Sequence, residues 1–229
     1  AWQIVHWWAH ISTGLMRLIV GTRFEVRGIE NLPETGAIIA PKHQSAWDTF
    51  CFLPWVNDPV YILKRELMWV PLFGWYVSRM NMIPIDRGNR EQSIRKVNEG
   101  ARREMAKGRQ LVIYPEGTRR PPGATPNYKS GIAYLYSATN VPVVPVAHNA
   151  GLFWPKGSFW RYPGVCEMEF LEPIQPGLDR ETFMATLSER LEAAADRLLL
   201  NAANGPNPPH LPPDAKRRVA ELRQQHETV

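Results

Sequence analysis

Lys42-His43-Gln44-Ser45-Ala46-Trp47-Asp48 directly follows an apolar run, Ala37–Ala40, whose pattern is typical of a short buried strand. Pro41 ends the predicted strand. Proteins with alternating strands and helices place their chemistry at the ends of strands. On one continuous helix, His43 and Asp48 would lie about 140° apart. We therefore expect His43 in a loop and Asp48 in the first turn of the following helix, where the two side chains can meet.

A histidine beside an aspartate is a recurrent acid–base unit. The carboxylate fixes one ring nitrogen as the protonated one and leaves the other nitrogen free to act as a base. The spacing of His43 and Asp48 is common by chance, so a loop histidine next to a helix-capping aspartate is an equally simple structural alternative. The stretch 42–48 is thus a candidate catalytic loop that requires support from elsewhere in the chain.

A second polar stretch, Pro115-Glu116-Gly117-Thr118-Arg119-Arg120, follows a predicted strand at 111–114. Gly117 allows a tight turn close to a ligand. Thr118 and Arg119 have side chains that hydrogen-bond phosphate, and the guanidinium group grips two oxygens at once. Glu116 would orient a cation or accept a bond from a hydroxyl group. The structural alternative is a polar turn with a surface arginine.

Seven short strand patterns alternate with helical patterns, which predicts a single α/β domain. The predicted strands span residues 22–26, 37–40, 60–63, 82–85, 111–114, 141–147 and 166–170. Because both polar stretches follow strands, they could share one edge of the sheet. Pro142 and Pro145 indicate an edge or irregular strand at 141–147.

The composition restricts the class of partner. A formal net charge of +5 favours anionic partners, namely nucleic acid, anionic lipid or phosphorylated substrates. The basic residues between 95 and 107 fall on the outer face of a predicted helix, which does not indicate a nucleic-acid site. Cys51 and Cys166 form neither a disulfide framework nor a metal pattern and suit a reducing compartment. The motifs of serine hydrolases, phosphate-cradling loops and zinc clusters are missing from the sequence.

Both ends of the chain are predicted to lie outside the main domain. In residues 1–21, polar and apolar residues form two opposite stripes of one helix. The apolar stripe is Ile4, Trp8, Ile11, Leu15 and Ile19. With three tryptophans near one end, this pattern favours a membrane-interface helix. The alternatives are a helix packed on the domain and the remnant of a cut membrane anchor. Residues 201–229 read as a proline-rich linker and a basic tail that forms a loose or short helix.

Two further segments are candidates for contact with lipid. The apolar run 68–77 is too short to span a bilayer. It fits a core helix, the wall of an acyl-chain groove or a membrane-facing helix. The loop 153–162 mixes Trp154 and Trp160 with Lys156 and Arg161. That mixture suits the headgroup region of a membrane, with packed loop aromatics as the alternative.

Taken together, the motifs resemble a known family. KHQSAWD, KRELMWVPLFGW, MIPIDR, YPEGTR and VPVVPVA occur in this order, as in the PlsC-type 1-acylglycerol-3-phosphate acyltransferases of the HxxxxD acyltransferase family, and the wording is bacterial-like. The resemblance covers about residues 22–200. The sequence departs from the usual family pattern at three positions. Lys42 stands where Asn or Ser is common, Asn81 where Gly is frequent, and Tyr114 where Phe is frequent.

The resemblance implies a mixed sheet of roughly seven strands flanked by helices, and no metal or organic cofactor. It implies transfer of an acyl group from acyl-CoA or acyl-carrier-protein to the free hydroxyl of lysophosphatidic acid, giving phosphatidic acid. The implied location is the cytoplasmic face of the inner membrane, on anionic lipid and without nucleic acid. Another lyso-lipid acceptor, such as lyso-ornithine lipid, is the alternative, followed by a non-catalytic lipid-binding protein on the same scaffold.

The resemblance also implies roles for individual residues. His43 acts as general base and Asp48 holds it, so that the substrate hydroxyl is the nucleophile. Ser45 and Cys51 are rival nucleophiles outside any nucleophile motif. The residues that match the family's acceptor-binding motifs are Arg87, Glu116, Gly117, Thr118 and Arg119, with Lys64 as a weaker candidate.

Overall fold

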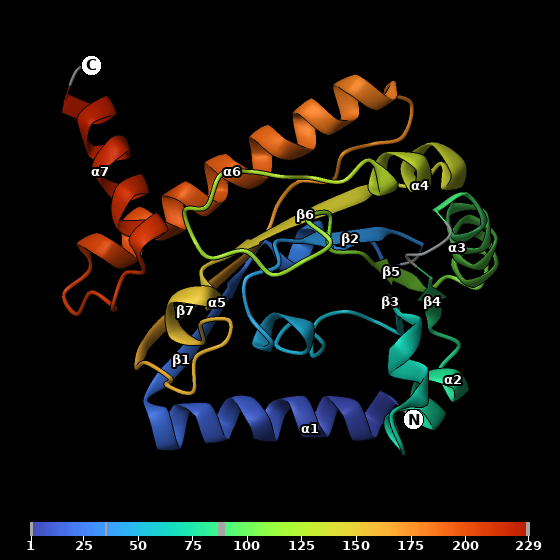
Figure 1. Cartoon of the computed structure of the whole chain (residues 1–229), viewed down its shortest axis with the longest axis horizontal. Coiled ribbons are helices and arrows are strands. Elements are labelled where there is room, and N and C mark those ends of the chain that lie inside the picture. The colour runs from blue at the N-terminus through green and yellow to red at the C-terminus, as the bar shows by residue number, and fades with distance from the viewer. Residues whose placement is uncertain (1, 35, 87–89, 228–229) are drawn as a thin grey trace.

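The protein is built on one seven-stranded sheet, seen here in a computed structural model that describes residues 2–34, 36–86 and 90–227 (Figure 1). The strands are β1 (Thr22–Arg27), β2 (Ile38–Pro41), β3 (Pro59–Lys64), β4 (Ile83–Ile85), β5 (Gln110–Val112), β6 (Val143–His148) and β7 (Gly164–Phe170). Their spatial order is β1-β7-β6-β2-β5-β3-β4. Among the described strand pairs, β6–β7 is antiparallel and the others are parallel. The predicted α/β domain with a mixed sheet is confirmed.

Strand β2 lies in the middle of the sheet, and all four of its residues are buried. It pairs in parallel with β6 on one side and with β5 on the other. Strands β3 and β4 continue the parallel order beyond β5. The carboxyl ends of β2, β5, β3 and β4 therefore share one edge of the sheet. This arrangement brings the segments that follow those strands toward one site.

Of the two alternatives for residues 141–147, an edge or an irregular strand, the edge strand was wrong, because β6 is an interior strand between β7 and β2. Pro145 is tolerated there for a local reason. Its carbonyl accepts a hydrogen bond from Leu171, which lies just beyond the end of β7 (2.9 Å). Since the nitrogen of a strand residue points to the same side as its carbonyl, the missing N–H of Pro145 faces the end of β7 and removes little from the ladder.

Helices cover both faces of the sheet (Figure 1). One face packs against α3 (Arg90–Met105), α4 (Gly131–Thr139) and α6 (Arg180–Asn204), where Phe183 and Leu187 reach Ile38. The other face carries the segment 47–56, whose Trp47 and Phe52 pack on Ile39. The shorter helical elements are η2 (Ile29–Asn31), η3 (Trp47–Thr49), η4 (Arg65–Trp69), α2 (Phe73–Arg79) and α5 (Ala150–Phe153).

The N-terminal helix turns its apolar side away from the protein. Helix α1 (Trp2–Leu15) continues into a wider turn, η1 (Met16–Val20), and Ala9 and Met16 are the buried residues on its inner side. The predicted apolar stripe, by contrast, is exposed along its whole length. The helix therefore packs on the domain through this inner side, and Trp8 of the stripe also contacts Phe50 (ring centroids 4.7 Å apart). Among the described residues, no helix is both long and apolar enough to cross a bilayer.

The C-terminal segment folds back onto the domain. Helix α6 runs to Asn204, past residue 200 where we expected a linker to begin. Helix α7 (Pro213–Glu227) packs through buried Ala215, Val219 and Leu222. Arg218 joins it to Asp196 of α6 by two hydrogen bonds (3.0 and 2.6 Å). Where we expected a loose or short helix, α7 is a packed helix, because Ala215, Val219 and Leu222 recur at helical spacing and face the domain.

Candidate active site

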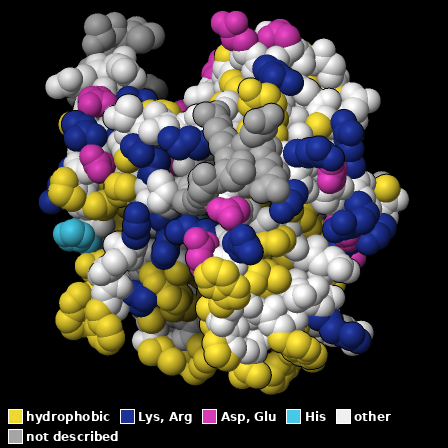
Figure 2. Space-filling view, turned by 45° about the vertical axis from the view of Figure 1, so that its right-hand side comes forward, with side chains coloured by type: hydrophobic (Ala, Val, Ile, Leu, Met, Phe, Trp, Pro, Cys, Tyr) yellow, Lys and Arg dark blue, Asp and Glu magenta, His cyan; other side chains and the backbone are white. Residues whose placement is uncertain are grey.

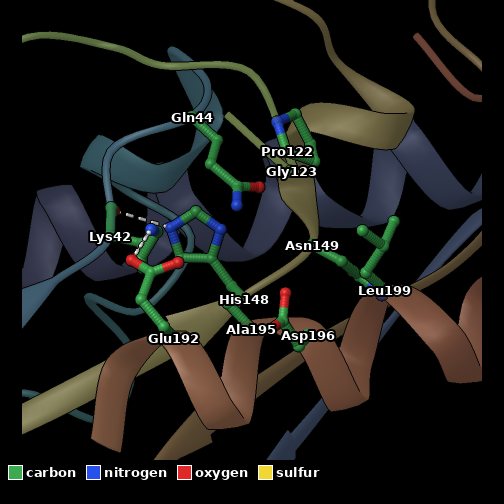
Figure 3. Close-up of a pocket in the computed structure, with 10 residues that line it drawn as sticks. All are labelled: Lys42, Gln44, Pro122, Gly123, His148, Asn149, Glu192, Ala195, Asp196 and Leu199. Carbon is green, nitrogen blue, oxygen red and sulfur yellow. Dashed lines mark hydrogen bonds and ion pairs between the residues drawn. The ribbon is translucent and has the colours of Figure 1, made fainter. Parts of the chain in front are cut away.

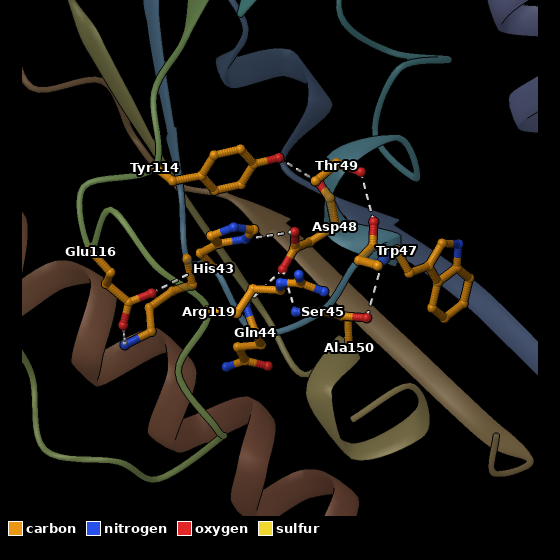
Figure 4. A network of polar contacts seen from close by, with 12 residues as sticks. His43, Gln44, Ser45, Trp47, Asp48, Thr49, Tyr114, Glu116, Arg119 and Ala150 are labelled. Atoms are coloured by element: carbon orange, nitrogen blue, oxygen red, sulfur yellow. Dashed lines mark hydrogen bonds and ion pairs between the residues drawn. The ribbon is translucent and has the colours of Figure 1, made fainter. Parts of the chain in front are cut away.

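The loop after β2 brings His43 and Asp48 together at the carboxyl edge of the sheet (Figure 4). The His43 Nδ1 lies 2.9 Å from Asp48 Oδ1. The imidazole is 16% exposed, whereas the carboxylate is fully buried. A buried carboxylate on Nδ1 favours the tautomer with the proton on that nitrogen. His43 Nε2 is then the basic atom, and no described residue forms a hydrogen bond with it.

Asp48 is fixed more firmly than the sequence suggests. It lies in the 3₁₀ turn η3, in place of the expected α-helix. Its Oδ2 accepts hydrogen bonds from the backbone N–H groups of Gln44 (2.6 Å) and Ser45 (2.7 Å). These two donors stabilise the carboxylate in a buried place and close the loop 42–48 on itself. The loop therefore presents His43 in one orientation.

Tyr114, two residues after the end of β5, contacts both members of the His43–Asp48 pair. Its ring stacks on the His43 imidazole, with centroids 4.1 Å apart. Its hydroxyl donates to the Asp48 carbonyl (2.8 Å). Burial, and then the charge of Asp48, raise the pKa of the Tyr114 phenol well above its ordinary value, so the hydroxyl stays protonated as a donor. The departure from the family's Phe thus adds one hydrogen bond to the catalytic loop.

The segment 115–120 is bonded directly to the catalytic loop. The Glu116 Oε2 accepts the backbone N–H of His43 (2.7 Å), and the backbone N–H of Arg120 donates to the His43 carbonyl (2.7 Å). Gly117 has a φ of 65°, a left-handed conformation that favours glycine. The two stretches that the sequence singled out therefore meet at one edge, as expected from the order of the parallel strands.

The other predicted site residues differ in their placement. Arg119 is partly exposed, Lys156 Nζ donates to its carbonyl (3.2 Å), and no described residue pairs with its guanidinium. Thr118 is exposed beside it. Lys64 ends β3 on the same edge of the sheet, with its side chain exposed. Arg87 lies outside the described residues. Glu116, in contrast, is buried, and its two oxygens face the His43 N–H and the Lys42 ammonium group.

The rival nucleophiles are poorly placed for attack. Ser45 is fully buried, and its Oγ accepts the backbone N–H of Trp47 (3.1 Å). Burial, with the nearby Cys166 and Asp48, raises the pKa of the Cys51 thiol well above its ordinary value. A buried, protonated thiol is a weak nucleophile. The described residues contain no group of three or more His, Cys, Asp or Glu able to hold a metal ion.

The sequence did not reveal His148, a fully buried residue at the end of β6. Its Nε2 donates to the carbonyl of Lys42 (2.8 Å), and its Nδ1 accepts the backbone N–H of Ala150 (3.3 Å). Burial lowers the pKa of His148, and the nearby Asp48 opposes that shift. A neutral ring with one donor and one acceptor suits both bonds. Only its position at a strand end next to β2 could have indicated this role.

Comparisons with known proteins identify the family. The family model described as Acyltransferase matches residues 23–149. A 1-acyl-sn-glycerol-3-phosphate acyltransferase of Pseudomonas aeruginosa is 37% identical over 191 residues, which cover 83% of this chain and 74% of the relative. A Saccharomyces cerevisiae enzyme of the same name is 31% identical and covers 70% of this chain and 54% of its own length. The crystal structure of PlsC from Thermotoga maritima superposes with a TM-score of 0.73 at 25% identity, covering 86% of this chain and 79% of that one.

Proposed function

The chain belongs to the family of 1-acyl-sn-glycerol-3-phosphate acyltransferases, and from that premise we propose that His43 and Asp48 carry out its acyl transfer. The enzyme moves an acyl group from a thioester to the free hydroxyl of lysophosphatidic acid, and the product is phosphatidic acid. The observation that carries the role of the pair is the contact between the partly exposed imidazole and the buried Asp48 carboxylate (2.9 Å).

The reaction proceeds by direct transfer. His43 Nε2 removes the proton from the acceptor hydroxyl as its oxygen attacks the thioester carbonyl. The new C–O ester bond forms, the C–S bond breaks, and the imidazolium returns its proton to the departing thiolate. Asp48 stabilises the imidazolium that exists in between. Neither Ser45 nor Cys51 takes part, since the hydroxyl of the acceptor is itself the nucleophile.

Arg119 and Thr118 bind the phosphate of the acceptor. The guanidinium of Arg119 has no partner among the described residues, and its segment is bonded to the carbonyl of His43 through Arg120. A phosphate monoester held there would place the glycerol hydroxyl near His43. Gly117 supports the turn, and Lys64 provides a further cation on the same edge. For Arg87 the proposal rests on the motif alone.

The protein works on a membrane surface, which it contacts through what we call the apolar face. This face consists of the exposed large hydrophobic residues of α1–η1, of the segment 67–75 and of the loop 159–160. Figure 2 shows hydrophobic side chains gathered along the edge that carries α1 and α2 in Figure 1. Trp2, at one end of α1, packs with Val77 of α2. At the other end, Thr22 bonds the carbonyl of Tyr162, so the three parts adjoin (3.0 Å).

An apolar patch of this extent is typical of a surface that meets lipid. Trp7 is 67% exposed, Trp69 is 71% exposed and Phe159 is 90% exposed. Trp154 is less suited as an anchor than the sequence suggested, because the Arg161 guanidinium covers its ring (4.0 Å). The chain's positive charge favours anionic lipid, and we place the protein on the cytoplasmic face of the inner membrane.

An acceptor panel tests the function. The purified protein is given a radiolabelled acyl-CoA or acyl-carrier-protein together with equal amounts of lysophosphatidic acid, lyso-ornithine lipid and lysophosphatidylcholine. We expect labelled phosphatidic acid as the main product, since only a phosphate monoester carries close to two charges for Arg119. A preference for lyso-ornithine lipid would show that the acceptor belongs to another class of lyso-lipid. Binding of lipid without any acyl transfer would identify a non-catalytic protein.

A further inference from the structure

A buried charged cluster lies directly behind the catalytic loop. Lys42 is only 6% exposed, and its ammonium group contacts Glu192 of α6 (2.6 Å), Glu116 (3.4 Å) and the hydroxyl of Tyr128 (3.3 Å). Tyr128 also donates a short hydrogen bond to Glu192. Figure 3 shows the Glu192 carboxylate against Lys42, in a small pocket between the catalytic loop and α6. The cluster therefore joins a helix near the C-terminus to the residue before His43.

The contacts of Glu116 separate it from the rest of its motif. One of its oxygens accepts the His43 N–H (2.7 Å), and the other faces the ammonium of Lys42. The side chain is only 2% exposed. A carboxylate enclosed in this way is closed off from a substrate hydroxyl. Arg119, three residues later, has a partly exposed side chain whose guanidinium is unpaired among the described residues.

The ionic state of the cluster follows from its burial. Desolvation raises the pKa of Glu116, and Lys42 is the largest influence that lowers it again. Burial, and then the charge of Glu192, raise the pKa of Tyr128, which keeps its hydroxyl protonated as a donor. The Lys42 ammonium group thus faces the acidic side chains of both Glu116 and Glu192. Removing that cation would leave two like charges close together in a poorly solvated place.

We propose that Glu116 and Lys42 are positioning residues for His43, with Glu192 and Tyr128 holding the ammonium group that Lys42 presents to Glu116. The inference rests on the proposed acyl transfer and gives the acidic residue of the second motif a task other than acceptor binding. It also accounts for Lys42 where the family commonly has Asn or Ser. In this chain a neutral residue there could not offset Glu116 and Glu192 together.

Steady-state kinetics separate positioning from acceptor binding. We expect Glu116→Ala to lower kcat by about 10-fold or more, the range for loss of a hydrogen bond to a charged group. Lys42→Met should act in the same direction, and Glu192→Gln and Tyr128→Phe more weakly, by a few fold. In all four variants the KM for lysophosphatidic acid should stay within about twofold of wild type, whereas Arg119→Ala should raise it. A raised KM with unchanged kcat in Glu116→Ala would overturn the inference.

A double variant sharpens the role of Lys42. If Lys42 only neutralises Glu192, then Lys42→Met combined with Glu192→Gln should recover wild-type kcat, and the inference fails. If Lys42 acts through Glu116, the double variant stays as slow as Lys42→Met. Glu189→Gln makes the same change at an exposed position of α6 and serves as the control. The control should have wild-type kinetics.

A readout without turnover completes the test. Hydrogen exchange of the His43 amide should accelerate in Glu116→Gln and in Lys42→Met relative to Glu189→Gln, because its acceptor is weakened or displaced. Thermal unfolding identifies any variant that no longer folds. In that case the kinetics and hydrogen exchange of the milder variants Glu116→Gln and Glu192→Gln test the inference. Unchanged exchange in folded Glu116→Gln with normal kcat would also overturn the inference. Failure of the wild-type protein to transfer an acyl group would instead refute the proposed function.

Discussion

The catalytic loop and the apolar face solve opposite problems. In the loop, polar groups are buried and are satisfied within the protein, as when Asp48 accepts two backbone N–H groups and the contact from His43. On the apolar face, large side chains such as Trp7 and Trp69 lie in solvent. The first region is complete except for a substrate, and the second is complete only when something apolar covers it.

The difference predicts that the two regions can be damaged independently. Changes in the loop should affect chemistry without affecting attachment to lipid. Changes on the apolar face should affect attachment without affecting the chemistry on a dissolved, short-chain acceptor. A turnover assay paired with liposome flotation therefore distinguishes damage to one region from damage to the other.

The largest effect is expected at the base itself. His43→Ala should lower turnover by roughly 10²–10⁴-fold, the usual contribution of a positioned general base. Asp48→Asn should also be severely impaired, because it loses the negative charge that fixes the tautomer and stabilises the imidazolium. Liposome flotation of both variants should equal that of wild type. Near-normal turnover in either folded variant would remove the pair from the mechanism.

Arg119 should give the next largest effect. Arg119→Ala should raise the KM for lysophosphatidic acid by about 10–150-fold, the loss of a charged hydrogen bond. Arg119→Lys keeps the charge but loses the two-pronged geometry, so it should fall between wild type and Arg119→Ala. The KM for the thioester donor should change little and serves as the internal control. An unchanged KM for lysophosphatidic acid in Arg119→Ala would contradict the phosphate clamp.

The apolar face provides the reverse experiment. Replacing Trp7, Trp69 and Trp160 with Ser should lower the partition coefficient for anionic liposomes by at least about 10-fold, because each exposed indole would bury considerable apolar area in lipid. The kcat on a dissolved short-chain acceptor should be unchanged. Trp47→Phe, inside the core, is the matched aromatic control and should float like wild type. Equal flotation of the triple variant would show that attachment uses another surface.

Tyr114→Phe tests the smaller support of the loop. It removes the hydroxyl that bonds the Asp48 carbonyl but keeps the ring on His43. A neutral hydrogen bond contributes about 0.5–1.5 kcal/mol, so kcat should fall by about 2–10-fold. Tyr114→Leu, which also loses the stacked ring, should fall further. Equal rates for the two variants would show that the ring has no part in orienting His43.

The smallest effect should come from the buried thiol. Cys51→Ala should keep most of the wild-type turnover, and iodoacetamide should not inactivate the folded enzyme at neutral pH, because burial keeps the thiol protonated. Any loss should appear as reduced thermal stability from the small cavity. Mass spectrometry of the enzyme after reaction with the acyl donor checks the mechanism. An acyl group trapped on Cys51 or Ser45 would contradict direct transfer and indicate a covalent intermediate.

The sequence by itself determined the strands, their number and the two segments that carry the site. Alternating and apolar patterns are local properties, so β2 and β5 could be placed, and each polar stretch follows its strand within a few residues. The order of motifs also indicated the family. The packing of the C-terminal segment could not be predicted from the sequence, because the apolar residues of α7 are buried only by contact with the rest of the folded domain.

Only the tertiary structure decided which partners each site residue has. Glu116 and Arg119 lie three residues apart in one motif, yet one is enclosed by Lys42 and the His43 amide and the other remains open. Glu192 and His148 reach the catalytic loop from elements more than a hundred residues away in the chain. Such contacts depend on strand order and helix placement, which are set by the whole core, and no local pattern of residues encodes them.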